Sequence, residues 1–595
     1  MLKKFLLIIC GSLVGSFIAI LVAMLGVLML GASISILMGG GKAQVKSHSI
    51  LRIDLCGPVA ERGTDADGIS ELVASLQGNE SGASLQEIER SLSVAKLDDN
   101  IDGVAIDCNG VQAAPATLRA IRKAILDFKK SKKWVYAYGH DGYAQGDYYV
   151  ASVADSVFIN PVGAIDVHGL ASCTPYFKKV LDKIGVEMQV VRVGAYKSAV
   201  EPYMLDAMSP ENREQQQAYL GNIWSVMERE MADARHISPA VFDQYVDSML
   251  MVQPVDTLLQ RRLVDAKVYR SDFESRLRKL TDVSDTDDLN YVSAQTLAAN
   301  YDAGDNRDGV IAVVYACGEI DGGTPGEGIN SDDLVDCIGE LERDDEVKAL
   351  VLRVNSPGGS AFGSEQIWHA IEQFKKAGKT VAVSMGDYAA SGGYYISCGA
   401  DRIFADSTTI TGSIGIFGVI PCAQELIENK IGVNVEVVKT NDNADLLTLG
   451  VLSKRLTPVQ YQAIQNSVNQ GYELFTKRCA DGRKMKQDSI KAIGGGRVWD
   501  GISAKKIGLV DQFGTLSDAI EWAAKKAGLN TGYYSVECYP SAEESLMSLL
   551  GKLPQANATE GVKREMGVFY TYYQSVEAIL HRDHILCLLP DTELK

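Results

Sequence analysis

Short apolar runs alternate with longer amphipathic segments along most of the 595-residue chain. The runs SILRIDLCG (49–57), GVAIDC (103–108) and WVYAYG (134–139) are apolar and rich in strand-forming residues. Between them, segments such as ATLRAIRKAILDFKKS (116–131) repeat their hydrophobic residues with the 3.6-residue period of a helix. Buried strands that alternate with amphipathic helices are typical of a mostly parallel sheet, so the pattern predicts an α/β fold.

The whole pattern occurs twice in the chain. GDYYVASVADSVFINP (146–161) resembles GGYYISCGADRIFADS (392–407), and LDDNIDGVAIDCNG (97–110) resembles RDDEVKALVLRVNS (343–356). Similar pairs follow in the same order at an offset of 246 or 247 residues. An offset of this length indicates duplication of a whole domain, because solenoid repeats are much shorter.

The duplication predicts the domain organisation. We expect residues 48–279 to form the first repeat and residues 307–540 to form the second. The polar stretch 280–306, with its Asp and Asn clusters, is expected to be the linker between them. Residues 541–595 form a C-terminal extension whose aromatic and leucine clusters are expected to dock on the body.

The first 41 residues differ from both repeats. After Lys3 and Lys4, the run from Phe5 to Gly41 carries no charged side chain, and about 20 apolar residues can span a bilayer as a helix. Positive residues before a span keep that end in the cytoplasm. We therefore expect residues 1–41 to be a single-pass anchor in the inner membrane, with the body on the periplasmic side. A cleaved signal peptide is the alternative, but the run is longer than a signal h-region and no clear A-x-A site follows it.

Composition narrows the classes of partner. The net charge of −18 argues against nucleic acid, which requires basic patches on the protein. The 11 cysteines form no C-x-x-C pair and no Cys/His cluster with zinc spacing. We therefore expect no metal and no other cofactor, and we interpret most cysteines as small buried hydrophobes.

One serine distinguishes the second copy from the first. The stretch MGDYAASGGYYISCGADRIF (385–404) contains Ser391, whereas the first copy has Gln145 at the offset of 246. A serine at a strand-to-helix turn is exposed in the way that a nucleophile requires. The alternative, a helix N-cap, does not explain why Gly392 and Gly393 follow, because glycine is unfavourable inside a helix.

A glycine loop also distinguishes the copies. The second copy has NSPGGSAFG (355–363) after its strand, where the first has CNGVQAAPA (108–116). Two adjacent glycines favour a tight turn. They can also present backbone amides to a developing oxyanion, which would complement a nearby nucleophile.

The base that would activate Ser391 is less evident. His369 is the only histidine between the glycine loop and the serine, and Asp387 lies four residues before it; neither is a strong candidate. A buried lysine is the third possibility, because desolvation disfavours its charged form. Lys197 lies in VRVGAYKSAVEPYM of the first copy, where the second has Asn443 or Ala444. A lone lysine is usually a surface residue, but the complementary losses fit one composite site between the repeats.

Several motifs together resemble one known family. They are GAYKSAVEPY (194–203), NSPGGSAFGSEQI (355–367), YAASGGYY (388–395), TGSIGIFG (411–418) and GRVWDGISAKKIGLVD (496–511). These motifs are similar to those of the signal peptide peptidase A family, in its long, membrane-anchored form also called protease IV. The resemblance covers nearly the whole chain. It implies tandem ClpP/crotonase-like domains behind an N-terminal transmembrane helix, and a serine protease with a Ser/Lys dyad.

The resemblance also implies roles for individual residues. Ser391 matches the nucleophile and Lys197 the general base. Ser413 matches the family serine that hydrogen-bonds the lysine and orients it. The glycines that match the oxyanion loop are Gly358 and Gly359, with Gly392 assisting.

These roles imply acyl transfer through a covalent intermediate. The resemblance also implies the substrates, which are released signal peptides and similar hydrophobic segments. A substrate is expected to bind extended beside the Gly-Gly strand, as an added β-strand. The resemblance further implies a bowl-shaped homotetramer. Two alternatives remain. The first is a crotonase-like enzyme that acts on acyl-CoA, but a protein body outside the cytoplasm would have no CoA available. The second is a non-enzymatic membrane scaffold, which does not explain why the serine and the lysine are divided between the repeats.

Overall fold

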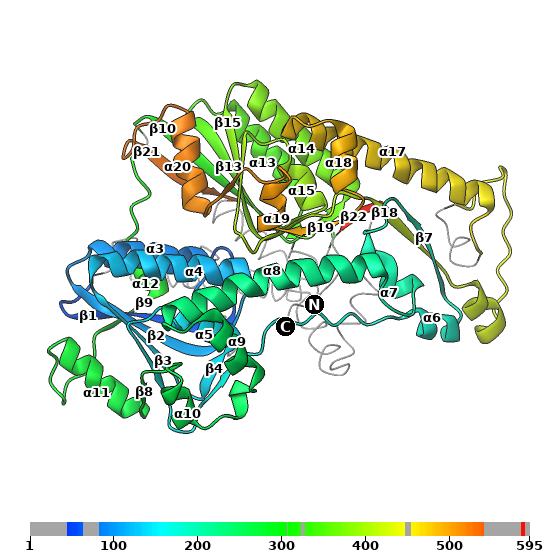
Figure 1. Ribbon diagram of the computed structural model, residues 1–595. Coiled ribbons are helices and arrows are strands. Elements are labelled where there is room, and N and C mark those ends of the chain that lie inside the picture. The colour runs from blue at the N-terminus through cyan, green and yellow to red at the C-terminus, as the bar shows by residue number, and fades with distance from the viewer. Residues whose placement is uncertain are drawn as a thin grey trace, which may run out of the picture.

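The computed structural model describes residues 44–63, 82–305, 307–322, 328–446 and 454–540, and the backbone of 585–588. Two α/β bodies lie one above the other in Figure 1, and the long helix α8 (Pro210–Ala234) runs between them. The expected membrane anchor, residues 1–41, and most of the C-terminal extension lie outside the described residues. Within the described part, no helix combines the length and apolarity that a membrane crossing requires.

The first repeat is built on a six-stranded sheet. Its strand order is β8-β5-β3-β2-β1-β9, and every neighbouring pair is parallel. The strands are β1 (Ser49–Pro58), β2 (Ile101–Gln112), β3 (Trp134–Gly139), β5 (Ser156–Ile159), β8 (Ala266–Lys267) and β9 (Tyr291–Ser293). A separate small sheet pairs β4 (Gly142–Ala144) with β6 (Ala164–Asp166).

The second repeat has the same topology. Its parallel strands follow the order β20-β16-β15-β13-β10-β21, which corresponds strand for strand to the first sheet. The strands are β10 (Gly309–Cys317), β13 (Val347–Ser356), β15 (Thr380–Ala390), β16 (Arg402–Ala405), β20 (Gln512–Phe513) and β21 (Tyr534–Tyr539). A branch adds β17 (Ile410–Gly412) and β19 (Val498–Asp500) beside the end of β15. The predicted α/β class is therefore confirmed.

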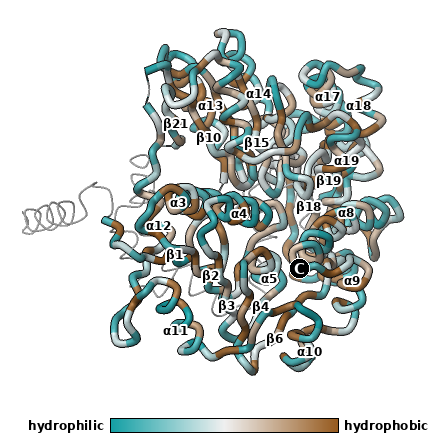
Figure 2. Tube along the Cα trace, turned by 60° about the vertical axis from the view of Figure 1, so that its left-hand side comes forward, coloured by the Kyte–Doolittle hydropathy of each residue, from teal (hydrophilic) through white to brown (hydrophobic). Residues whose placement is uncertain are grey.

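Amphipathic helices cover these sheets. In the first repeat they are α3 (Leu85–Leu97), α4 (Pro115–Phe128), α5 (Gln145–Ala151), α6 (Lys178–Ile184), α7 (Glu201–Met204), α8, α9 (Pro239–Asp247), α10 (Val255–Gln260) and α11 (Arg270–Leu280). In the second they are α13 (Ser331–Arg343), α14 (Ala361–Lys376), α15 (Gly392–Ser397), α17 (Pro458–Arg483), α18 (Gln487–Ile493), α19 (Gly501–Lys506) and α20 (Leu516–Lys526). In Figure 2, α3 and α4 show both hydrophobic and hydrophilic colours, as helices with one buried face do.

The long helices begin at capping residues. Ser209 accepts a hydrogen bond from the amide of Asn212 at the start of α8, and Thr457 accepts one from the amide of Gln460 at the start of α17. Each helix has a proline in its first turn, where the missing N–H has no cost. Capping and proline together define where both helices begin.

The first repeat extends into the stretch expected to be a linker. Within 280–306, β9 pairs with β1, and α12 (Ala294–Ala298) follows directly. β9 takes the sheet edge that β21 takes in the second repeat. Leu297 is fully buried, so this short segment belongs to the core despite its polar surroundings.

A mixed sheet joins the repeats. Its order is β12-β11-β14-β22-β18-β7. The strands are β7 (Glu187–Arg192), β11 (Glu319–Ile320), β12 (Gly328–Ile329), β14 (Gly358–Ser360), β18 (Phe417–Cys422) and β22 (Ile585–Leu588). β7 of the first repeat runs antiparallel to β18 of the second, from Arg192 beside Phe417 to Glu187 beside Cys422. This pairing places the chain after β7 against the second repeat.

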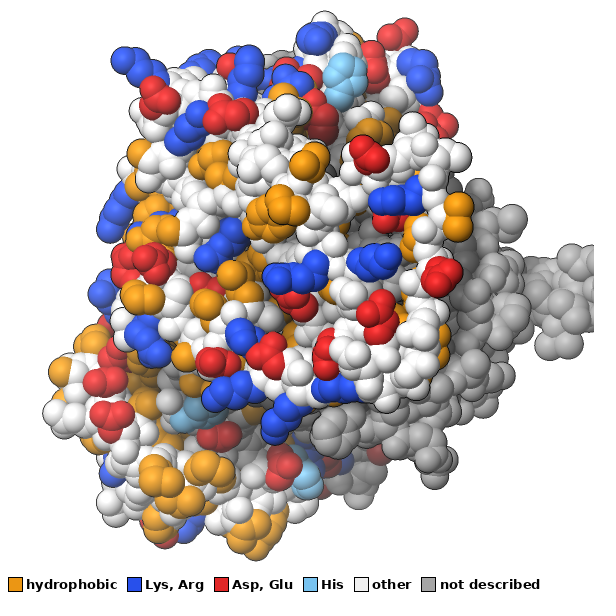
Figure 3. Space-filling view, turned by 90° about the vertical axis from the view of Figure 1, so that its right-hand side faces the viewer, with side chains coloured by type: hydrophobic (Ala, Val, Ile, Leu, Met, Phe, Trp, Pro, Cys, Tyr) orange, Lys and Arg blue, Asp and Glu red, His pale blue; other side chains and the backbone are white. Residues whose placement is uncertain are grey.

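The face drawn in Figure 3 carries a mixed set of charges. Lysine and arginine side chains alternate there with aspartate and glutamate, and hydrophobic side chains lie between them. Some large hydrophobic residues of the second repeat are also strongly exposed, among them Phe362, Val438 and Val459. Singly exposed apolar residues of this kind are normal on protein surfaces.

Candidate active site

Ser391 lies at the turn between β15 and α15, as expected, but it is fully buried and not exposed as the sequence predicted. Its φ of 56° and ψ of −113° are unusual for a residue with a Cβ atom. Its amide donates to the carbonyl of Gly412 (2.8 Å), and the amide of Tyr395 donates to its carbonyl (2.8 Å). The side chain makes no N-cap hydrogen bond. The structure therefore does not use this hydroxyl as a helix cap, and strained backbone of this kind is typical of functional turns.

Lys197 reaches Ser391 from the other repeat. It follows β7 and is fully buried. Its Nζ lies 2.8 Å from Ser391 Oγ, 3.1 Å from Ser413 Oγ and 3.4 Å from the carbonyl oxygen of Ser413. The structure thus brings together the three residues that the sequence singled out, two from the second repeat and one from the first.

The backbone of Ser413 is held firmly. It follows β17 with a φ of 49°, and its amide donates to the carbonyl of Arg497 (2.7 Å). Its hydroxyl and carbonyl oxygens both face the amine of Lys197. Ser413 is therefore placed to orient the lysine side chain through two acceptors on one residue.

A glycine loop of the second repeat holds the backbone of Lys197. The amide of Tyr196 donates to the carbonyl of Gly495 (3.1 Å). A Cβ atom at Gly496 would lie 2.6 Å from the N, Cα and Cβ atoms of Lys197, closer than real Cβ contacts. A Cβ atom at Gly194 would lie 2.2 Å from the carbonyl oxygen of Gly495. The two loops can approach this closely only because both consist of glycine at the contact.

Gln215 is a site residue that the sequence reasoning missed. From α8 its Nε2 donates to the Tyr196 carbonyl (3.2 Å) and to Ser198 Oγ (3.0 Å), on both sides of Lys197. Its Oε1 accepts from the amide of Val498 in β19 (3.0 Å). One buried amide side chain therefore ties the lysine loop to the second repeat. A lone glutamine in an amphipathic helix gives no sequence signal for this role.

The Gly-Gly loop packs against the turn that carries Ser391. Gly358 and Gly359 have φ values of 109° and 151°, which favour glycine. A Cβ atom at Gly392 would lie 3.1 Å from both Gly358 Cα and Gly359 N. The Gly358 amide donates to Ser356 Oγ (3.2 Å). The three glycines expected at an oxyanion hole therefore lie together beside the serine, with the amide of Gly358 directed at its own loop.

The two other candidate bases have different roles. His369 is exposed on α14, where its Nε2 lies 3.0 Å from Gln373 Nε2. Asp387 accepts hydrogen bonds from the amide (2.8 Å) and hydroxyl (2.6 Å) of Thr117 in the first repeat. Burial raises the pKa of the Asp387 carboxyl, although the bonds from Thr117 lower it. Asp387 thus joins the repeats, and neither residue has a hydrogen bond to Ser391 among the contacts of the described chain.

The equivalent positions of the other copy carry neither a nucleophile nor a buried lysine. Gln145, opposite Ser391, accepts from the amides of His168 (3.0 Å) and Gly169 (2.9 Å) and donates to the carbonyl of Gly169 (3.0 Å). Asn443 and Ala444, opposite Lys197, are exposed. Each repeat therefore supplies only one of the two residues, Ser391 or Lys197.

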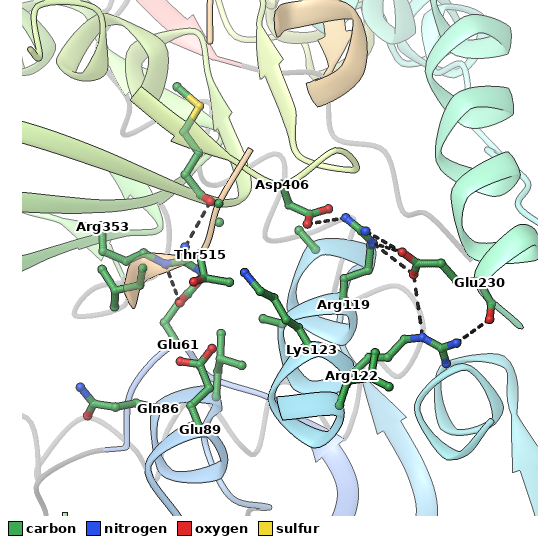
Figure 4. A pocket seen from close by; sticks show the side chains of 18 of the residues that line it. Glu61, Gln86, Glu89, Arg119, Arg122, Lys123, Glu230, Arg353, Asp406 and Thr515 are labelled. Atoms are coloured by element: carbon green, nitrogen blue, oxygen red, sulfur yellow. Dashed lines mark hydrogen bonds and ion pairs between the residues drawn. The ribbon is translucent and has the colours of Figure 1, made fainter. Parts of the chain in front are cut away.

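A cavity of about 410 Å³ lies between the repeats, and neither Ser391 nor Lys197 lines it (Figure 4). Arg353 and Glu61 form a buried ion pair at its wall (Nε–Oε2 2.9 Å). Arg119 connects Glu230 of its own repeat to Asp406 of the second. These pairs join the two repeats, so they help to fix where the lysine meets the serine.

One carboxyl group that lines this cavity, that of Glu89, has a raised pKa. Burial raises the pKa of Glu89 on α3 from 4.5 to about 7, although the positive charge of Arg353 lowers it. The nearby charge of Glu61 raises it further. Glu89 therefore changes charge near neutral pH, away from the serine and the lysine.

Comparison with known proteins settles the family. The model of peptidase family S49 matches residues 127–284 and 373–530, two regions whose bounds differ by 246 residues. The chain belongs to peptidase family S49. "Protease 4" of Salmonella typhi is 36% identical over 538 residues, which are 87% of this chain and 85% of that protein. "Serine protease SPPA, chloroplastic" of Arabidopsis thaliana is 30% identical over 460 residues, 76% of this chain and 66% of that protein.

Membership of family S49 makes the chain a serine protease, as the sequence motifs indicated. The two matched regions also confirm the duplication at the offset read from the sequence. Among solved structures, a ClpP1 mutant from Listeria monocytogenes matches 36% of this chain and 95% of its own at 16% identity, with a TM-score of 0.23. A likeness this slight carries no argument, so the ClpP/crotonase-like arrangement stays a prediction.

Proposed function

We propose that this serine protease is a membrane-anchored endopeptidase in which Ser391 is the nucleophile and Lys197 the general base. One observation carries the proposal: Lys197 Nζ lies 2.8 Å from Ser391 Oγ in a fully buried site. Nucleophile and base must be within hydrogen-bond reach of each other. Neither repeat contains both residues, so the proposed dyad requires both copies.

The surroundings of Lys197 favour its neutral form. Burial disfavours the charged ammonium group, and the three hydrogen bonds described for Nζ are to uncharged oxygen atoms. The ring of Phe417, whose centroid lies 5.7 Å from Nζ, also carries no charge. A neutral amine has two N–H groups and one lone pair. The two oxygens of Ser413 can accept the two N–H groups, which leaves the lone pair directed at the hydroxyl of Ser391.

The reaction then follows from this geometry. Lys197 takes the proton of Ser391, and the serine oxygen attacks the carbonyl carbon of a peptide bond. The C–N bond breaks as the protonated lysine gives its proton to the leaving amine. Water then gives a proton to the neutral lysine and attacks the ester. As the C–O bond breaks, the lysine returns that proton to the serine oxygen, which releases the acid product and the free serine. The bonds made and broken involve only the peptide, water and these two side chains.

The glycine loop supports the oxyanion of this reaction. The backbone of Gly359 lies against that of Gly392, next to the serine, so amides from both segments can face the same point. Removal of a single oxyanion donor typically costs about a hundredfold to a thousandfold in kcat. Gly358 can contribute its amide once that amide turns from Ser356 to the substrate.

The substrates that we propose are released signal peptides and other hydrophobic peptide segments. The motif resemblance supports this class, and so does the uncharged run from Phe5 to Gly41, which would hold the protease at the inner membrane with its body on the periplasmic side. We also propose a homotetramer. The motif resemblance supports this assembly.

Proteolysis by purified variants tests the proposal. We expect Ser391→Ala and Lys197→Met each to lower kcat/KM for a hydrophobic reporter peptide by at least about a thousandfold. The matched control is Ser397→Ala, because Ser397 is also buried but donates to the carbonyl of Gly393 (2.6 Å) and does not face the lysine. Wild-type turnover by either dyad variant would refute the assignment, and activity lost equally in the control would indicate damage to the fold.

A further inference from the structure

The C-terminal strand β22 fills the space between two strands of the second repeat. It runs antiparallel to β14 on one side and to β18 on the other. Figure 1 shows it in red beside β18, between the two bodies. Its partners in β14 are Gly358, Gly359 and Ser360, which face Leu588, Cys587 and Leu586.

Both neighbours of β22 belong to the candidate active site. β14 begins with the two glycines that lie against Gly392. β18 begins four residues after Ser413, and its other edge pairs with β7, which leads to Lys197. β22 also contacts α15, the helix that starts directly after Ser391. It therefore occupies the slot in which a peptide substrate would bind as an added strand.

The direction of β22 matches the acyl half of a substrate. The strand runs from Ile585, beside Gly418, to Leu588, beside Gly358. In a substrate, the residue that supplies the scissile carbonyl lies at the oxyanion amides. The residues before it extend back along the slot. Leu588 has the position of that carbonyl-supplying residue.

We propose that the C-terminal segment is an intramolecular ligand of the substrate slot, an extended aliphatic strand that any incoming peptide must displace. The inference rests on the proposed function, because that function defines the slot as the substrate site. The sequence ILCLLP (585–590) has the aliphatic character proposed for the substrates. A segment of the same chain competes intramolecularly, at an effective concentration and not at its concentration in solution, so even a weakly bound strand competes with a free peptide.

A single backbone donor provides the test variant. Cys587 faces Gly359 and lies in the middle of β22, so Cys587→Pro removes an N–H from a strand that has neighbours on both sides. Cys587→Ala is the matched control, because it changes the side chain and keeps the N–H. Leu586→Pro is a second variant, since Leu586 faces both Ser360 and Phe417.

Peptide binding tests the inference independently of catalysis. A fluorescent peptide with the sequence EAILHRDHILCLLPD (577–591) is titrated into full-length, detergent-solubilised chains that all carry Ser391→Ala. We expect Cys587→Pro to bind the peptide at least about tenfold more tightly than Cys587→Ala or the chain with the native tail. If β22 leaves the slot open in only about a tenth of the molecules, the apparent affinity of those two chains for the peptide is tenfold weaker. Equal affinity in the three chains would overturn the inference.

Kinetics of the same substitutions with Ser391 intact separate the two proposals. We expect Cys587→Pro to lower KM for the reporter peptide by a similar factor with kcat retained. An unchanged KM in both proline variants, with an unchanged unfolding temperature, would overturn the inference while the proposed function stands. If no variant cleaves the reporter, the proposed function fails and the binding experiment alone decides whether β22 fills a peptide slot.

Discussion

Gly496 lies so close to Lys197 that a Cβ atom at position 496 would be 2.6 Å from the N, Cα and Cβ atoms of the lysine. The two residues come from different repeats, and among the described glycines of the second repeat only Gly496 would place a Cβ atom this close to the lysine backbone. The position of the candidate base therefore depends on the absence of a side chain at residue 496.

Substitution of this glycine should separate activity from folding. We expect Gly496→Ala to lower kcat/KM at least about a hundredfold, because displacement of a reacting group by about 1 Å has costs of that size. The control is Gly528→Ala: Gly528 has a similar φ (77° against 82°), but a Cβ atom there would meet nothing within 4 Å. In both variants an alanine must adopt a positive φ, which lowers the stability of the folded protein by about 1–2 kcal/mol. Equal activities would contradict the role of Gly496.

Ser413 should affect catalysis without affecting substrate affinity. Ser413→Ala removes the hydroxyl that lies 3.1 Å from Lys197 Nζ and leaves the carbonyl at 3.4 Å. We expect kcat to fall between about tenfold and a hundredfold, since the amine loses part of its orientation, and KM to change little. Steady-state kinetics of Ser413→Ala, with Ser397→Ala as the control variant, measure both kcat and KM. A fall in activity that arises from KM alone would show that Ser413 contacts the substrate instead.

Glu89 should make stability depend on pH. Its pKa is raised from 4.5 to about 7 in the folded protein, so between these values the folded state holds a proton that the unfolded state has lost. The contribution of Glu89 to stability therefore falls as pH rises through this window. Glu89→Gln does not titrate, so its unfolding temperature should rise relative to wild type between pH 4.5 and about 7.

Thermal unfolding at a series of pH values measures this difference. Glu340→Gln is the control, because Glu340 is an exposed carboxylate on α13. The difference between Glu340→Gln and wild type should stay flat over the same range. A flat difference for Glu89→Gln as well would show that Glu89 is not the group that titrates.

The ion pair between Arg353 and Glu61 should stabilise the junction of the repeats. The two side chains are only 7% and 9% exposed, so Arg353→Met leaves a buried carboxylate without an ion-pair partner, with one hydrogen bond from Asn355 Nδ2 (2.9 Å). We expect a loss of about 3–5 kcal/mol in the free energy of unfolding. Arg307→Met is the control, because its pair with Asp305 is 63% and 46% exposed and should contribute no more than about 1 kcal/mol. Equal unfolding midpoints in urea would contradict the expectation.

The sequence was sufficient to find Ser391 and Lys197 because the two repeats of the chain can be compared with each other. Ser391 stands opposite Gln145, and Lys197 stands opposite Asn443 or Ala444, so each loss was visible within one chain. The α/β class followed from the alternation of apolar and amphipathic segments. The role of each residue as nucleophile or base stays a prediction.

Other features of the site depend on contacts that a sequence does not encode locally. The register of β7 against β18 joins two short apolar strands from different repeats, and apolar strands do not identify their partners. Gln215 and Gly496 matter only because the chain after β7 passes between them. The edge strand β9 has three residues in a polar stretch, too few for a periodic pattern.

Covalent labelling with a fluorophosphonate probe, followed by identification of the modified residue by mass spectrometry, tests the central claim most directly. The account predicts that Ser391 alone carries the label, and that Ser391→Ala is not labelled although it keeps Ser413. It also predicts that Lys197→Met is labelled at least about a hundredfold more slowly, as loss of a general base requires. A label on another residue, or wild-type labelling rates in Lys197→Met, would contradict the Ser391–Lys197 dyad.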